Sequence, residues 1–195
     1  MSKEVLEILD LKDMLKKTGK IYGDRPGYNV KIREGEYKVF THKEIRDMVD
    51  YLGTALIDLG LRGKRIAVIG ENRYEWELAY LAVVCGTGIV VPIDKSLPEN
   101  ELEEVIERSE VEAIFYLQKY QEIIERIKYS EKNKLKHLIS MDLTSNIEGV
   151  YSQKELIKNG KKLVEQGNRE FIDAKINPEE MSIMLFTSGT TSKSK

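Results

Sequence analysis

The last nine residues of the chain bring together the groups that proteins use to bind phosphate. Hydroxyl groups donate to phosphate oxygens, the backbone beside a glycine can approach an anion closely, and a lysine supplies a positive charge. The spacing differs from the Gly-x-x-x-x-Gly-Lys-Ser/Thr loop, because Ser194 stands where the second glycine would be needed. We therefore predict a polyphosphate-binding loop of another kind. Its expected binding residues are Thr187, Ser188, Gly189, Thr190, Thr191, Ser192, Lys193 and Lys195.

An apolar run comes directly before this loop. Ile183, Met184, Leu185 and Phe186 are typical of a short buried strand, which would hold the loop at the edge of a sheet. The alternative is a flexible polar tail. The order of the hydroxyl, glycine and lysine residues behind an apolar run favours the loop.

The same nine residues resemble the signature Thr-Ser-Gly-Thr-Thr-Gly-x-Pro-Lys of the adenylate-forming, or AMP-binding, superfamily. Six of its eight defined positions match, and Ser192 and Ser194 stand where the family has glycine and proline. Residues 70–76, Gly-Glu-Asn-Arg-Tyr-Glu-Trp, look like the corresponding segment of long-chain fatty acyl-CoA synthetases. Similar segments extend the resemblance over residues 24–195.

This resemblance implies a reaction in two steps. A carboxylate attacks the α-phosphate of ATP, which gives an acyl-adenylate and pyrophosphate, and a thiol then displaces AMP. ATP, Mg²⁺ and CoA are the implied cosubstrates and cofactor, and a fatty acid is the implied substrate. An acyl-carrier protein is the alternative acceptor. The loop would hold the β- and γ-phosphates; neither a catalytic residue nor a metal ligand is assigned within the chain.

The resemblance also implies a domain organisation. Residues 1–40 would form a helix and a small hairpin, residues 41–176 βα units, and residues 177–195 the strand and phosphate loop of a partial N-terminal domain. Segments that bind adenine, ribose and magnesium, and a mobile C-terminal domain, would follow Lys195, so the chain alone would be inactive. Two alternatives stay open: a non-enzymatic nucleotide- or phosphate-binding α/β module, and an interaction domain derived from a synthetase.

Composition is compatible with this interpretation. The 195 residues are 41% apolar and 33% charged, enough for a core and a polar surface, and a net charge of −2 argues against a nucleic-acid binder. No apolar run approaches the roughly 18 residues that span a bilayer, and the amino terminus does not resemble a signal peptide. We expect a cytoplasmic protein. An amphipathic helix over residues 4–17 would pack on its own protein or make peripheral membrane contact.

Apolar periodicity predicts an α/β fold in which helices flank a parallel sheet. A helix over residues 41–60 begins with the capping box Thr41-x-x-Glu44 and ends at Gly60. Expected strands lie near residues 66–70, 89–93, 113–117 and 137–140, with room for a helix between each pair. Further helices are expected over residues 73–85, after Pro98, near residues 123–127 and after Ser152. Residues 22–40 should form a hairpin that turns at residues 33–36.

Overall fold

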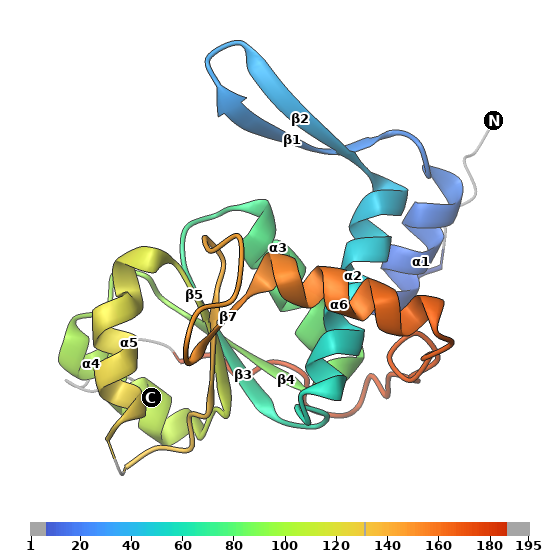
Figure 1. Ribbon diagram of the computed structural model, residues 1–195. Helices are drawn as coiled ribbons and strands as arrows, with labels where there is room; N and C mark the ends of the chain where they lie inside the picture. The colour runs from blue at the N-terminus through green and yellow to red at the C-terminus, as the bar shows by residue number, and fades with distance from the viewer. Residues whose placement is uncertain (1–6, 131, 187–195) are drawn as a thin grey trace.

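A five-stranded parallel sheet lies at the centre of the protein, and helices cover both of its faces (Figure 1). The computed structural model describes residues 7–130 and 132–186. The spatial order of the strands is β4-β3-β5-β6-β7. Their bounds are Arg65–Ile69 for β3, Ile89–Ile93 for β4, Ala113–Tyr116 for β5, His137–Ser140 for β6 and Val150–Ser152 for β7.

The four predicted strands are confirmed, each to within one residue at either end. The fifth strand, β7, was not predicted. It has only three residues and pairs in parallel with β6 from Leu138 to Ser140. A run this short gives no period-two signal, and it leads directly into the helix that begins after Ser152.

Alternate residues along the strands build two separate cores. Ile66 and Val68 of β3 face one core, which is completed by α1 (Leu11–Ile21), α2 (His42–Asp58), α3 (Tyr74–Ala82) and α6 (Gln153–Glu165). Ala67 and Ile69 face the other, beneath α4 (Glu99–Ser109) and α5 (Gln121–Lys128). Both faces of the sheet are therefore buried, as expected for parallel strands.

Local signals set the ends of α2 as the sequence predicted. The Thr41 side chain accepts from the Glu44 backbone N–H, and the Glu44 carboxylate accepts from the Thr41 N–H at 2.8 Å. At the other end, Gly60 adopts a φ of 80°, and the Leu61 N–H donates to the Leu56 carbonyl at 3.1 Å. This left-handed residue closes the helix, because glycine takes a positive φ without a Cβ clash.

Two predicted helices have different bounds in the structure. The amino-terminal helix α1 begins at Leu11, because Asp10 caps it by accepting from the Asp13 N–H, and it continues to Ile21 instead of ending at residue 17. The helix expected to reach residue 85 ends at Ala82 and continues as a π-helical turn, η1 (Val83–Thr87). Gly86, with a φ of 139°, breaks the regular helix there.

The predicted hairpin is confirmed as β1 (Pro26–Arg33) and β2 (Glu36–Thr41), which pair antiparallel. It projects beyond α1 and α2 (Figure 1), and Tyr28 of β1 lies against Tyr74 of α3. Gly35, with a φ of 75°, forms the turn. Among the described residues, no helix is long and apolar enough to cross a membrane.

The strand expected before the phosphate loop is reduced to one parallel bridge, between Ile183 and Val90 of β4. The Met184 N–H donates to the Val90 carbonyl at 2.9 Å, and Met184 packs against the core. Ile183 and Leu185 are 36% and 66% exposed, and Met184 and Phe186 are only partly buried, so the expectation of a buried run was wrong. The run lies beyond the edge strand β4, and only one of its faces meets the core.

Candidate functional site at the carboxyl edge of the sheet

The connections of the sheet change direction between β3 and β5. The chain leaving β3 passes to α3 on the first face, whereas the chain leaving β5 passes to α5 on the second face. Such a change of direction is a topological switch point, and open α/β sheets bind their ligands at the carboxyl ends of the strands beside it. This topology makes the carboxyl edge the candidate functional site.

Charged side chains from three strand ends meet at this edge. Glu71 follows β3, Lys95 follows β4 and Lys119 follows β5. Lys119 Nζ lies 2.7 Å from Glu71 Oε1, and Lys95 pairs with the other carboxylate oxygen. Hydrogen bonds from Lys119 and then Lys95 lower the pKa of Glu71 to about 2. The carboxylate therefore stays ionised and ties three loops together.

A second network ties the loop after β3 to those after β5 and β6. Arg73 Nη1 lies 2.6 Å from Asp142 Oδ1, and its Nη2 lies 2.9 Å from Glu75 Oε1. The Gln118 N–H donates to the other Asp142 oxygen at 2.7 Å. The two carboxylates raise the pKa of Arg73, led by the hydrogen bond to Glu75. These loops are thus held by paired charges.

The described chain ends beside the edge strand β4, just before the predicted phosphate loop. Ile183 forms an isolated parallel bridge with Val90, and the residues after it are not in a strand. Phe186 packs against the second core, and the Arg108 guanidinium lies 5.6 Å from its ring centroid. Arg108 belongs to the last turn of α4, so the bridge and this contact hold the described end of the chain against β4 and α4.

The eight predicted phosphate-binding residues lie outside the described residues. They are Thr187, Ser188, Gly189, Thr190, Thr191, Ser192, Lys193 and Lys195. In the described part of the chain, no group of three His, Cys, Asp or Glu side chains could hold a metal ion.

Sequence reasoning missed the charged residues of this edge. Glu71, Lys95, Lys119 and Asp142 each stand within three residues of the end of a strand. A charged residue just after each predicted parallel strand is a signal that could have found them, since the carboxyl ends of such strands share one edge. Which charges pair depends on the strand order, which the sequence did not give.

Comparison with known proteins identifies the family. The model of the family described as AMP-binding enzyme matches residues 15–195. This chain belongs to the AMP-binding enzyme family. This match confirms the resemblance seen in the signature and in residues 70–76. The chain is related to adenylate-forming acyl-CoA ligases.

Curated relatives of this AMP-binding chain are mostly CoA ligases. It is 27% identical over 175 residues to long-chain-fatty-acid–CoA ligase 5 of Rattus norvegicus, covering 82% of this chain and 24% of the relative. It is 28% identical over 170 residues to fatty acyl-CoA synthetase A of Dictyostelium discoideum, covering 84% and 25%. The chain thus spans about a quarter of the length of these relatives.

Solved structures of AMP-binding enzymes share its fold. The anthranilate CoA ligase AuaEII, in complex with anthranoyl-AMP, matches with a TM-score of 0.79 at 19% identity, over 98% of this chain and 34% of that one. A long-chain-fatty-acid-CoA ligase from Archaeoglobus fulgidus matches with a TM-score of 0.74 at 21% identity, over 93% and 35%. The fold is therefore that of part of the N-terminal domain of adenylate-forming enzymes.

Proposed function

We propose that this chain is the amino-terminal part of an ATP-dependent ligase that activates a fatty acid as its acyl-adenylate and transfers it to CoA. The family match over residues 15–195 carries the proposal. Curated relatives named as long-chain fatty-acid–CoA ligases, at 26–27% identity, support the choice of a fatty acid.

In this proposal, residues 187–192, Lys193 and Lys195 bind the β- and γ-phosphates of ATP. Hydroxyl and backbone donors with a lysine would stabilise the charge that grows on the leaving pyrophosphate. The bridge to β4 and the packing of Phe186 support it, because they anchor the residues before the loop to a rigid sheet. Mg²⁺ would accompany ATP and neutralise part of the phosphate charge; its ligands are not assigned.

ATP–pyrophosphate exchange by the full-length natural protein tests the proposal. We expect exchange that depends on long-chain carboxylic acids and that falls about 100-fold in the Lys195→Ala variant, as on removal of one group that stabilises transition-state charge. Lys162→Ala, an exposed lysine of α6, serves as the control and should exchange normally. A folded protein that binds ATP yet exchanges with no acid would instead be a nucleotide-binding module.

The acceptor and the location need separate measurements. Thioester formation with CoA, compared with a phosphopantetheinylated acyl-carrier protein, distinguishes the two acceptors, and we expect CoA to react. We expect the protein in the cytoplasmic fraction of disrupted cells. If the protein is instead recovered with the membranes and high salt releases it, it makes peripheral membrane contact.

A further inference from the structure

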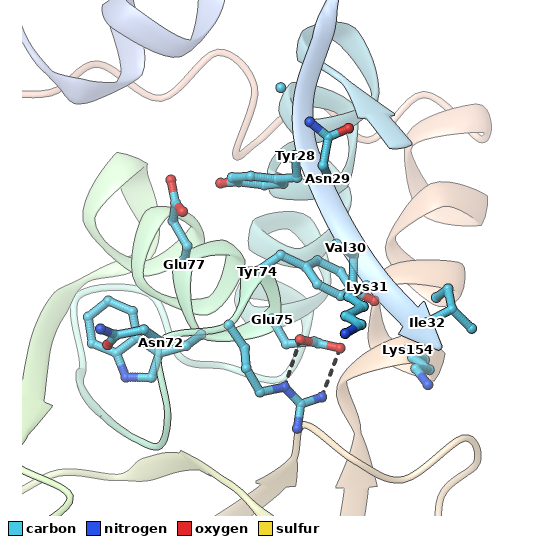
Figure 2. Close-up of a pocket in the computed structure, with 13 residues that line it drawn as sticks. Tyr28, Asn29, Val30, Lys31, Ile32, Asn72, Tyr74, Glu75, Glu77 and Lys154 are labelled. Carbon is cyan, nitrogen blue, oxygen red and sulfur yellow. Dashed lines mark hydrogen bonds and ion pairs between the residues drawn. The ribbon is translucent and has the colours of Figure 1, made fainter. Parts of the chain in front are cut away.

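A cavity of about 1000 Å³ lies between the hairpin and the start of α3. Figure 2 shows β1 along one side of it, α3 along another and Lys154 of α6 near the end of β1. Arg73 and Glu75 of the second charge network line it, whereas residues 94–97, 117–120 and 182–186 do not. The cavity is therefore separate from the place where the chain approaches the predicted phosphate loop.

Apolar side chains form much of the cavity wall. Tyr28, Val30, Tyr74 and Trp76 are partly buried and pack against the core behind them. The Tyr28 and Tyr74 rings lie 6.4 Å apart, which joins the hairpin side of the wall to the α3 side. Ile32, 57% exposed, continues the apolar surface to the end of β1. An extended apolar group would remove this surface from water.

Three of the five charged groups in the wall interact with neighbouring residues. Glu75 pairs with Arg73, as the dashed lines in Figure 2 show. Glu77 lies near the Tyr28 hydroxyl, and burial together with Glu77 raises the pKa of Tyr28. The side chains of Lys31 and Lys154 differ from these three, because they have no such partners among the described residues. Among the residues that the structure describes, neither ammonium group has a hydrogen-bond or ion-pair partner.

The charge balance indicates what would bind there. The lining side chains carry three positive charges and two negative ones, so a single negative charge would neutralise the cavity. These two exposed lysines come from different elements, β1 and α6, and both line the cavity, whose wall combines apolar and polar side chains. A small hydrophilic anion would leave that apolar wall in water, whereas an uncharged chain would leave the ammonium groups unpaired.

We propose that this cavity binds an amphipathic monoanion, namely a long-chain carboxylate whose chain lies along Val30, Tyr74 and Trp76 and whose carboxylate pairs with Lys31 and Lys154. Such a ligand satisfies both features of the cavity at once. The site needs neither ATP nor the predicted phosphate loop. It is an additional acyl-binding site on the amino-terminal part of the enzyme.

Fluorescence of Trp76 gives a direct measurement, because it is the only tryptophan of the chain and it lines the cavity. The chain is titrated with dodecanoate below its micelle concentration, without ATP. We expect a saturable change in emission. Dodecanol, which has the chain without the charge, and butanoate, which has the charge without a long chain, should each bind at least about tenfold more weakly.

Variants show whether the signal comes from this cavity. The double variant Lys31→Ala, Lys154→Ala should bind dodecanoate about tenfold more weakly, and Ile32→Asp should weaken binding at the exposed end of the wall. Lys162→Ala, on the same helix as Lys154 but outside the cavity, should bind like the parent. Thermal unfolding of each variant verifies that it is folded.

Three results would overturn the proposal: no saturable change in emission, equal affinity for dodecanol and dodecanoate, or unchanged affinity in the double lysine variant. The titration contains no ATP and reports on Trp76, whereas pyrophosphate exchange reports on adenylate formation. Failure of this site is therefore distinguishable from failure of the proposed ligase activity.

Discussion

Gly160 of α6 lies directly against the backbone of Tyr51 in α2. A Cβ added at Gly160 would lie 1.8 Å from the Tyr51 carbonyl oxygen and 2.6 Å from its carbonyl carbon. Both atoms belong to helix backbone, which cannot move aside as a flexible side chain could. The two helices can therefore pack this closely only because residue 160 has no side chain.

We expect Gly160→Ala to destabilise the fold by about 3 kcal/mol or more, because α6 must move away from α2. Denaturant unfolding followed by circular dichroism measures the change. Asn159→Ala, at an exposed position of the same helix, is the control and should change stability by less than about 0.5 kcal/mol. Equal stability of the two variants would show that the helices are not in such close contact.

The Arg73–Asp142 ion pair should stabilise the carboxyl edge measurably. A double-mutant cycle with Arg73→Met and Asp142→Asn is expected to give a coupling energy of about 1 kcal/mol, because both groups are only partly exposed and have further partners. The Arg126–Glu99 pair, 65% and 55% exposed, is the matched control and should couple by less than about 0.5 kcal/mol. A coupling at Arg73 no larger than the control's would contradict the proposed role of this network.

Lys12 should make stability depend on alkaline pH. Its ammonium group is buried, donates to the carbonyls of Phe171 and Ala174, and lies near Lys16, Asp50, Asp10 and Cys85. Burial, and next the charge of Lys16, lowers the pKa of Lys12 from 10.5 to about 8. Between these values the unfolded chain binds the proton and the folded chain does not, so stability rises with pH.

Between pH 8 and 10.5, Lys12 is expected to raise the free energy of unfolding by at most about 3 kcal/mol. Below pH 8 the group is protonated in both states, so this gain is absent. Other groups titrate in this range, so the measurement is the difference in unfolding free energy between the parent and Lys12→Met as a function of pH. We expect that difference to grow as the pH rises. A difference independent of pH would mean that Lys12 keeps its ordinary pKa in the fold.

The capping box of α2 should contribute about 1 kcal/mol to stability through Thr41. Its side chain accepts from the Glu44 N–H at 3.2 Å, and in Thr41→Ala that N–H would lose its side-chain partner. Thr144→Ala, in an exposed loop, removes the same hydroxyl without removing a cap and should be nearly neutral. Chemical denaturation of both variants compares the two. Similar losses in both would indicate that the cap is not a stabilising feature.

The sequence by itself determined what depends on neighbouring residues. The capping box at Thr41, the glycine stop at Gly60, the hairpin turn at Gly35 and four strands follow from residue types within a few positions of one another. The family was also readable, because the order of residues 187–195 and residues 70–76 carries it. The roles of residues 187–195 stay a prediction, since they lie outside the described residues.

Only the tertiary structure decided which distant residues meet. Glu71 pairs with Lys95 and Lys119 because β3 lies between β4 and β5, and that order results from which helices cover each face of the sheet. The cavity beside Trp76 likewise depends on how the hairpin lies against α3. Local patterns are fixed by short-range sterics and hydrogen bonds, whereas these long-range contacts depend on the packing of all layers at once.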